Sequence, residues 1–179
     1  KKAKKEEDPS LSITARSAGT DMSGGPLNDS IIVDFTKHCN RFIEIGDDYA
    51  IVEPGMMYRD FEKLAGEKGL LFPSYPASKQ LCAMGGIVAN NSGGEKTLKY
   101  GKTEEYILEL KAVFDDGEEY TIKPLNNAEL EIKEKISTRE GEIYRTLHRL
   151  IADNEEQIKK AKPNVHKNSA GYFLWNVMR

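Results

Sequence analysis

The sequence predicts an α+β domain. Short runs with β-strand character are concentrated in the first third of the chain, apolar residues recur at helical spacing further on, and a glycine-rich loop directly follows the first strand. The 179 residues are 39% hydrophobic and 31% charged, with a net charge of −3. This composition is that of an ordinary globular protein without a basic stripe, and it disfavours nucleic-acid binding.

Four strands are expected before residue 55, at residues 11–15, 31–35, 42–45 and 49–52. Residues 11–15 alternate apolar and polar side chains, as a half-buried strand does. Asp47-Asp48 supplies a turn between the last two strands, and Pro54-Gly55 ends them.

The helical apolar spacing begins after these strands. Residues 57–68 place Tyr58, Phe61, Leu64 and Ala65 on one face, and Gly69 is positioned to end that helix.

A hairpin and a second helix are expected in the rest of the chain. Residues 106–114 and 118–122 flank Asp115-Asp116-Gly117, a sequence suited to a tight turn. Ser137 and Glu140 have the spacing of a capping box, which predicts a helix reaching about Asn154.

The first glycine-rich loop, residues 16–25, contains three glycines and three small hydroxyl residues. Glycine allows positive φ and close approach, so successive backbone N–H groups can converge on an anion such as a diphosphate. The spacing matches neither the GxGxxG dinucleotide motif nor the P-loop. An ordinary glycine-rich surface turn remains the alternative for this loop taken alone.

The second loop, residues 84–94, places a short run of small residues between two glycine pairs. This pattern predicts a tightly packed helical turn whose free N-terminal N–H groups face a ligand. Tyr100-Gly101 follows shortly afterwards and offers an aromatic ring beside the site, with a core position as the alternative for Tyr100.

These segments, together with 52–55 between them, resemble in order and spacing the PCMH-type FAD-binding domain of the vanillyl-alcohol oxidase and p-cresol methylhydroxylase flavoproteins. Within that family the chain looks most like glycolate oxidase FAD subunits, D-lactate dehydrogenases and D-2-hydroxyglutarate dehydrogenases. The resemblance covers residues 11–120, and residues 167–172 echo a further short stretch.

The resemblance implies two α/β subdomains, about 1–55 and about 56–179, with FAD between them. It also implies that the domain is truncated at both ends and that the substrate-capping domain lies outside this chain. Loop 16–25 would hold the pyrophosphate, residues 53–55 would lie near the adenine, and residues 76–94 would line the remainder. The implied cofactor-binding residues are Arg16, Ser17, Ala18, Gly19, Thr20, Asp21, Ser23, Gly24, Glu53, Pro54, Gly55, Pro76, Ala77, Ser78, Cys82, Gly85, Gly86, Asn90, Ser92, Gly93, Gly94, Tyr100 and Gly101.

We expect the FAD to be bound non-covalently. Family members that attach FAD through histidine carry that histidine where this chain has Thr20, and Cys82 does not match the position of the cysteinyl-linked members. His38, His148 and His166 form no catalytic constellation, and no metal-ligand spacing is present. No catalytic residue is assigned within this chain.

The implied reaction is the oxidation of a 2-hydroxy acid, such as D-lactate or glycolate, to the 2-oxo acid by hydride transfer to the flavin, followed by electron transfer to an acceptor. Two alternatives stay open. One is a non-enzymatic nucleotide-binding module, and the other is a flavin reductase of the UDP-N-acetylenolpyruvoylglucosamine reductase type.

Cysteine usage and hydropathy bear on the cellular location of the protein. Cys39 and Cys82 lack CxxC spacing, so we interpret them as reduced thiols in a cytoplasmic protein. No apolar run approaches the roughly 18 residues of a membrane span, although a peripheral location at the membrane stays open. Oligomer formation and an electron-transfer subunit stay open too. The lysine-rich start is interpreted as a solvated helix end, with a phosphate-binding tail as the alternative.

Overall fold

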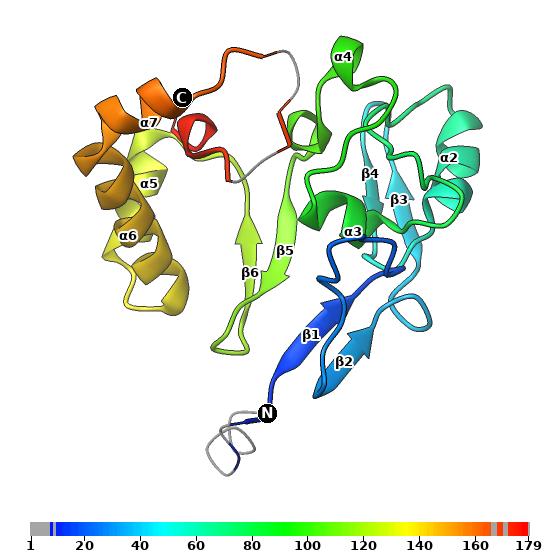
Figure 1. Ribbon diagram of the computed structural model, residues 1–179, viewed down its shortest axis with the longest axis horizontal. Coiled ribbons are helices and arrows are strands. Elements are labelled where there is room, and N and C mark those ends of the chain that lie inside the picture. Colours follow the sequence, from blue (N-terminus) through cyan, green and yellow to red (C-terminus); the bar gives the residue numbers. More distant parts are fainter. Residues whose placement is uncertain (1–7, 9, 166–167, 170–171, 179) are drawn as a thin grey trace. The chain divides into compact units, whose positions relative to one another are not determined.

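The computed structural model describes residue 8 and residues 10–165, 168–169 and 172–178 (Figure 1). Its contacts divide the chain into two compact units, Lys1–Ile107 and Leu108–Arg179, and each is considered by itself. His166, most of the lysine-rich start and three of the six residues at 167–172 that echo the family lie outside the described residues.

The first unit contains two separate two-stranded sheets. β1 pairs with β2 in parallel, and β3 pairs with β4 in an antiparallel hairpin that is irregular between Phe42 and Glu44. The strands are β1 (Ile13–Arg16), β2 (Ile31–Asp34), β3 (Phe42–Ile45) and β4 (Ala50–Val52). All four strands predicted before residue 55 are therefore present.

The helices among the described residues of the first unit are short, and they follow the strands in the chain. They are α2 (Tyr58–Gly66), α3 (Met84–Ala89), α4 (Thr97–Tyr100) and the 3-10 helix η1 (Thr103–Tyr106). The predicted helix near 57–68 is confirmed as α2. Gly69 adopts a φ of +71° just after it, and the Leu70 N–H donates to the Ala65 carbonyl, so the predicted stop is also confirmed.

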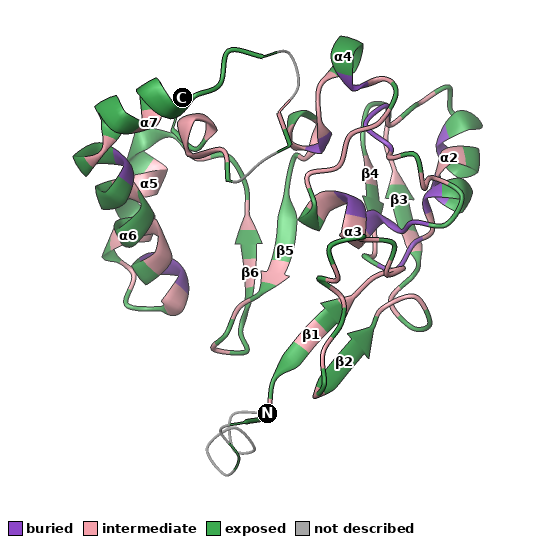
Figure 2. Cartoon of the chain, in the orientation of Figure 1, coloured by how far each residue is buried: buried purple, intermediate pink, exposed green. Residues whose placement is uncertain are grey.

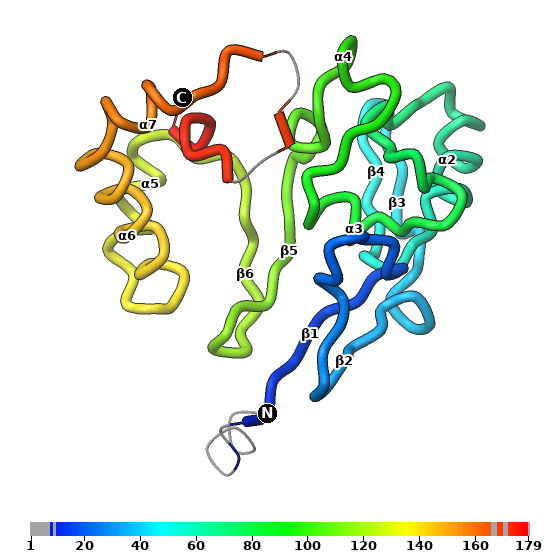
Figure 3. Tube along the Cα trace, viewed as in Figure 1, coloured from blue at the N-terminus to red at the C-terminus, as the bar shows by residue number. Residues whose placement is uncertain are grey.

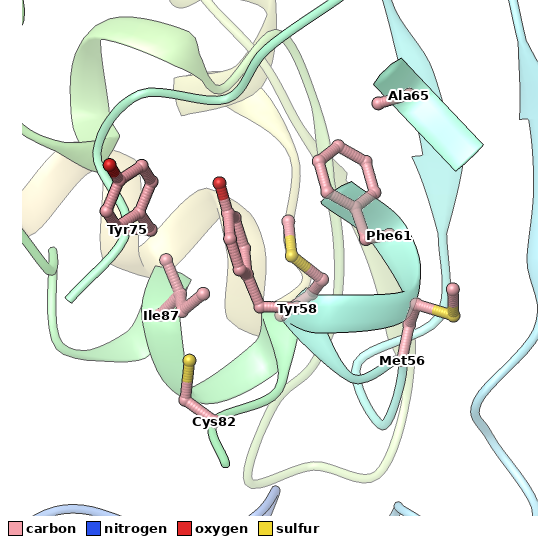
Figure 4. Packing of buried hydrophobic residues seen from close by; sticks show 8 residues of the cluster. Met56, Tyr58, Phe61, Ala65, Tyr75, Cys82 and Ile87 are labelled. Atoms are coloured by element: carbon pink, nitrogen blue, oxygen red, sulfur yellow. The ribbon is translucent and has the colours of Figure 1, made fainter. Parts of the chain in front are cut away.

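The core of the first unit lies between α2, α3 and the β3–β4 hairpin. Tyr58 is fully buried, and its ring lies 6.0 Å from that of Phe61 and 5.4 Å from that of Tyr75, measured between centroids. Figure 4 shows these rings with Ile87 and Cys82, and Figure 2 shows that buried residues concentrate on α2, α3 and the adjoining segments. Aromatic packing of this kind supplies much of a small core's stability.

The second unit contains an antiparallel hairpin and a helical pair. Leu110 of β5 (Leu110–Val113) pairs with Ile122 of β6 (Glu119–Ile122), and Gly117 in the connecting turn has a φ of +83°. The helices are α5 (Asn127–Lys135), α6 (Arg139–Asp153), α7 (Glu155–Ala161) and the 3-10 helix η2 (Leu174–Asn176). The helix predicted after Ser137 is confirmed as α6.

Two local predictions for this part of the sequence are wrong. The first hairpin strand begins at Leu110 rather than at Tyr106, because the residues before it form η1 and its extended continuation. The N-cap of α6 is Thr138 rather than Ser137, and Glu140 does not close a capping box. Glu140 is buried instead, with its carboxylate 2.5 Å from the Lys133 ammonium of α5.

The capping box of this region belongs to α5, which the sequence reasoning missed. The Asn126 side chain accepts from the Glu129 N–H at 3.0 Å, and the Glu129 carboxylate accepts from the Asn126 N–H at 2.8 Å. Helices and strands therefore follow one another in separate groups, as the α+β class predicts. Within the described ranges, no helix has the length and apolar character needed to cross a bilayer.

We expect Tyr58→Phe to lower the free energy of unfolding by about 1 to 2 kcal/mol. The Tyr58 hydroxyl donates to the Phe72 carbonyl at 2.8 Å, and removing it leaves that carbonyl without this partner in the core. The matched control is Tyr49→Phe, because the Tyr49 hydroxyl bonds Glu44 on an exposed hairpin. Urea unfolding of both variants measures the difference, and equal losses would contradict the role of Tyr58.

Candidate functional site

The loop after β1 presents backbone N–H groups without protein partners. Within the described residues, the N–H groups of Ala18, Gly19 and Thr20 donate to no acceptor. Gly19 has a φ of +68°, and a Cβ placed on it would collide with the guanidinium of Arg16, so that cation lies against the same loop. Converging N–H groups beside a guanidinium form a site for an anion.

Arg16 keeps its charge available to a ligand. Among the described residues it forms no ion pair, since its guanidinium has no carboxylate within salt-bridge distance. The first loop therefore has the arrangement expected of an anion-binding nest: the Arg16 guanidinium lies beside the unpaired N–H groups of residues 18–20.

Asp21 shapes the second half of this loop. Its carboxylate accepts from the Ser23 hydroxyl at 2.6 Å, from the Ser23 N–H at 3.2 Å and from the Gly25 N–H at 3.1 Å. The bonds from the Ser23 hydroxyl and N–H lower the pKa of Asp21 below its ordinary value. Two backbone donors of the loop, the N–H groups of Ser23 and Gly25, are thus used internally.

The carbonyl of Pro54 joins the two glycine-rich loops. It accepts a hydrogen bond from the Ser17 hydroxyl at 2.9 Å and another from the Gly85 N–H at 2.8 Å. The space where a Gly86 Cβ would stand is 3.5 Å from the Ser17 Cβ, an ordinary van der Waals contact. Figure 3 shows the loop after β1 beside α3. Three segments that the sequence singled out separately therefore meet at one atom.

The rest of the 53–55 turn is fastened to the preceding segment. Both carboxylate oxygens of Glu53 bind Arg41, one to the guanidinium at 2.8 Å and the other to the Arg41 N–H at 2.8 Å. The Gly55 N–H donates to the Cys39 carbonyl at 2.7 Å, and a Cβ on Gly55 would collide with the Phe35 carbonyl. Glu53 thus holds the turn in place through Arg41.

The expectation that α3 presents free N-terminal N–H groups is wrong. The N–H of Met84 donates to the Met56 carbonyl at 2.8 Å, that of Gly85 to Pro54, and that of Gly86 to the Ala83 carbonyl at 3.1 Å. The isolated bridge between Met57 and Ala83 draws this end of the helix onto the core. The glycines serve close packing there, since a Gly85 Cβ would lie 2.6 Å from the Pro54 Cβ.

The segment after α3 is held by an asparagine that the sequence reasoning passed over. Asn91 has a φ of +43°, and its side chain both accepts from the Glu104 N–H at 2.9 Å and donates to the Glu104 carboxylate at 3.0 Å. The neighbouring Ser92 carbonyl accepts from the Thr103 hydroxyl at 2.9 Å. Asparagine tolerates this backbone conformation better than most residues, and that tolerance was the available signal.

The second glycine pair lies against residues 75–76. A Cβ on Gly94 would collide with the Tyr75 carbonyl, and it would stand 3.3 Å from the Pro76 Cα. The Pro76 and Ser78 carbonyls accept backbone bonds within a tight turn around Ala77, and Cys82 ends that segment in the core. The predicted 76–82 and 93–94 stretches are thus brought together.

Cys82 is unsuited to covalent attachment. It is 3% exposed, and burial raises the pKa of its thiol above the ordinary value, so the thiol stays protonated near neutral pH. Cys39 and Cys82 are both free cysteines in this structure.

Tyr100 and Gly101 lie at the end of α4. The Tyr100 ring is half-exposed and lies 4.9 Å from the Lys99 ammonium, measured to the ring centroid, so it is not a core residue. Gly101 has a φ of +77°, and its carbonyl accepts from the buried Ser74 hydroxyl at 3.1 Å. Asn90 is exposed at the end of α3.

The second unit has a shallow cleft of about 420 Å³ between α5 and α6. The His148 Nδ1 lies 2.6 Å from a carboxylate oxygen of Glu134 there. The Arg145 guanidinium donates to the backbone carbonyls of Glu134 and Ile136. None of the predicted site residues contributes to it. The cleft is lined by Glu134, Arg145, His148, Arg149, Ala152 and Asp153. Among the described residues, no group of three or more His, Cys, Asp or Glu side chains is arranged to hold a metal ion.

A comparison with models of known families places the two glycine loops in context. Residues 3–123 match the model of the FAD binding domain, which is more than half of the chain. The chain belongs to the FAD binding domain family. The match spans loop 16–25, the Pro54 turn and residues 84–101, so the resemblance predicted from their order is confirmed.

Two sequence relatives support the assignment of the chain to the FAD binding domain family. D-2-hydroxyglutarate dehydrogenase of Escherichia coli (strain K12) is 30% identical over 177 residues, covering 98% of this chain and 17% of that protein. Glycolate oxidase subunit GlcD of Bacillus subtilis (strain 168) is 36% identical over 110 residues, covering 59% of this chain and 23% of that protein. The chain therefore spans only about a fifth of the length of these relatives.

The fold is also found in a solved oxidase structure. The crystal structure of 6-hydroxy-D-nicotine oxidase from Arthrobacter nicotinovorans superimposes with a TM-score of 0.59 at 27% identity, covering 69% of this chain and 27% of that one. The α+β fold of the FAD-binding domain is thus confirmed.

The residues present fit FAD. A dinucleotide carries a diphosphate, and the first loop combines the unpaired N–H groups of Ala18, Gly19 and Thr20 with the Arg16 guanidinium. Gly24 has a φ of +82°, and the space beside its Cα is open as far as a Leu27 methyl group 3.8 Å away. A ligand can therefore approach the backbone closely at this position.

We expect Gly85→Ala to lower the free energy of unfolding by about 2 kcal/mol or more, because the new methyl group must displace backbone and ring atoms of Pro54. The matched control is Gly86→Ala in the same helical turn, where a methyl group meets only ordinary contacts and improves helix propensity. Thermal and urea unfolding compare the two variants. Equal stability would show that the approach to Pro54 is not tight.

Proposed function

We propose that this chain is the FAD-binding portion of an oxidoreductase that converts a 2-hydroxy acid into the 2-oxo acid. The observation that carries the proposal is the meeting of Ser17, Pro54 and Gly85 at one carbonyl, beside a loop with unpaired donors. The similarity to D-2-hydroxyglutarate dehydrogenase and glycolate oxidase sequences supports the choice of substrate class.

The chain's own residues bind and orient the cofactor. Arg16 and the free N–H groups at 18–20 hold the diphosphate, and the Ser17 hydroxyl keeps that loop in register with α3. Bound FAD supplies the hydride-accepting chemistry. The remaining predicted contacts, residues 53–55, 76–78 and 90–101 among them, line the cofactor on the side of the second loop.

The FAD is held without a covalent bond in this proposal. Thr20 stands where histidine-linked members carry their attachment residue, and the Cys82 thiol is protonated and buried. An electron acceptor receives the electrons after substrate oxidation. The free thiols of Cys39 and Cys82 support a cytoplasmic location. The two predicted subdomains, divided near residue 55, remain a prediction about how the domain closes around FAD.

Substrate oxidation tests the activity directly. We expect the purified full-length protein to be yellow, to release FAD on denaturation, and to reduce a dye acceptor with D-lactate, glycolate or D-2-hydroxyglutarate. Flavin bleaching by the hydroxy acid under anaerobic conditions is the independent readout. A protein that binds FAD but is reduced only by NADPH would favour the reductase alternative, and one that binds FAD without reduction by either would favour the nucleotide-binding module.

We expect Gly24→Val to retain less than about a tenth of the wild-type flavin, because a β-branched side chain at positive φ is strained and blocks the diphosphate. The matched control is Gly117→Val, which carries the same strain at a φ of +83° in the β5–β6 turn. Flavin absorbance per polypeptide measures both. Full flavin in Gly24→Val, or equal loss in the two variants, would refute the assignment of this loop to the diphosphate.

A further inference from the structure

Two apolar side chains in and just after the first glycine-rich loop are open to solvent. Met22 is 101% exposed and Leu27 is 68% exposed. Neither was among the residues predicted to bind the cofactor. Single exposed apolar residues are common on protein surfaces, so exposure alone assigns them no role. What distinguishes these two is their position at the loop that would hold the diphosphate.

Leu27 borders the open space at Gly24. Apart from the chain neighbours of the glycine, a Cβ placed on Gly24 would meet one heavy atom within 4 Å, the Leu27 Cδ1 at 3.8 Å. The Leu27 methyl group therefore bounds the space through which a ligand approaches this part of the backbone. A ligand that fills the space contacts Leu27.

The backbone that carries Leu27 is fixed by hydrogen bonds of the protein itself. The Leu27 N–H donates to the Gly24 carbonyl at 3.0 Å. The side-chain amide of the next residue, Asn28, donates to the Ser12 hydroxyl at 3.0 Å and to the Thr14 hydroxyl at 2.6 Å, which fastens this segment to the start of β1. A contact residue on an ordered segment loses little conformational freedom when a ligand binds.

Met22 lies at the turn that Asp21 closes. The Asp21 carboxylate accepts from the Ser23 hydroxyl and N–H, so the side chains on either side of Met22 bind each other while the Met22 side chain stays in solvent. Along the chain, Met22 stands between the unpaired N–H groups of residues 18–20 and the open space at Gly24. Methionine is unbranched and polarisable, and it adapts its shape to a surface that packs on it.

The loop region therefore offers two kinds of contact. The Arg16 guanidinium and the N–H groups of residues 18–20 suit a diphosphate, whereas Met22 and Leu27 suit an apolar surface. Sites for small molecules commonly combine a few polar groups with an apolar lining. FAD has this composition, because a flat ring system lies on each side of its diphosphate.

We propose that Met22 and Leu27 pack against an apolar part of bound FAD next to the diphosphate, and that both are therefore further cofactor-binding residues. This inference rests on the proposed FAD-binding function and adds two side-chain contacts to it. The hydrogen bonds of the loop hold the anion, and the two apolar side chains exclude water beside it.

Substitution of Leu27 separates binding from folding. We expect Leu27→Ala to lower the affinity for FAD about threefold to tenfold, because the complex buries less apolar area. The thermal midpoint of the apoprotein should stay the same, since the side chain is largely exposed without the ligand. Leu27→Met keeps a long apolar side chain and should bind FAD within about twofold of the wild type. The matched control is Leu108→Ala, which removes a side chain that is 65% exposed and should leave the affinity unchanged. Quenching of flavin fluorescence on titration of the full-length apoprotein measures the affinity.

Oxidation of Met22 reports the contact directly. Hydrogen peroxide transfers one oxygen atom to a methionine thioether, giving the sulfoxide and water, and exposed side chains react most readily. Met22 of the full-length apoprotein should be oxidised, and saturating FAD should slow the reaction about threefold or more. Met178 is 44% exposed in the second unit and is the internal reference, whose rate should not change with FAD. Inorganic diphosphate binds the donors without an apolar contact, so it should leave the Met22 rate unchanged. Mass spectrometry of peptides from samples kept in the dark measures both methionines.

Four outcomes would overturn the inference. Met22 could be oxidised equally fast with and without FAD, or inorganic diphosphate could protect it as well as FAD, which would assign the protection to ordering of the loop. Leu27→Ala could bind FAD as tightly as the wild type. Met22 could also be unreactive in the apoprotein, which would mean that another part of the full-length protein covers it. A wild-type protein that takes up no FAD would instead refute the proposed function, and this inference with it.

Discussion

The hydrogen bonding of the Pro54 carbonyl organises the first unit of this protein. One oxygen accepts from the Ser17 hydroxyl and from the Gly85 N–H, and each bond contributes about 1 kcal/mol by itself. Their greater effect is geometric, because they bring a loop from the β1–β2 pair and a helix from the core against the same turn. A diphosphate-binding loop needs such support, since a ligand gains affinity only from donors that are already in place.

The glycines near the Pro54 carbonyl are of two kinds, which differ in what surrounds them. Gly85, Gly55 and Gly94 lie where a methyl group would meet backbone atoms of another segment, so they allow the chain to pack closely. Gly19 and Gly24 instead take positive φ values, Gly19 with the Arg16 guanidinium against it and Gly24 with open space beside its Cα. The first kind holds the scaffold together and the second makes room for a cofactor, although a sequence motif displays both as the same letter.

Local patterns predicted most of the elements but not their connections. β1 and the turn at Gly117 follow from alternation and from turn chemistry, which act over a few residues. The N-cap of α6 is Thr138 rather than the chemically similar Ser137, and Glu140 binds Lys133 of α5 instead of closing a capping box. Likewise, the glycine-rich loops predicted an anion site from the sequence. The burial of the Thr97 hydroxyl without a partner among the described residues results from tertiary packing, and no sequence motif corresponds to it.

The hydrogen bonding of the Pro54 carbonyl also has a consequence for sequence variation at residue 54 and its neighbours. Its acceptor belongs to the main chain, so no amino-acid replacement at residue 54 can delete it. Proline adds stiffness there, but the oxygen would remain with any side chain. The evolutionary record of this constraint should therefore be carried by its neighbours, as small residues at 85 and hydroxyl residues at 17, while residue 54 itself drifts more freely than its structural importance suggests.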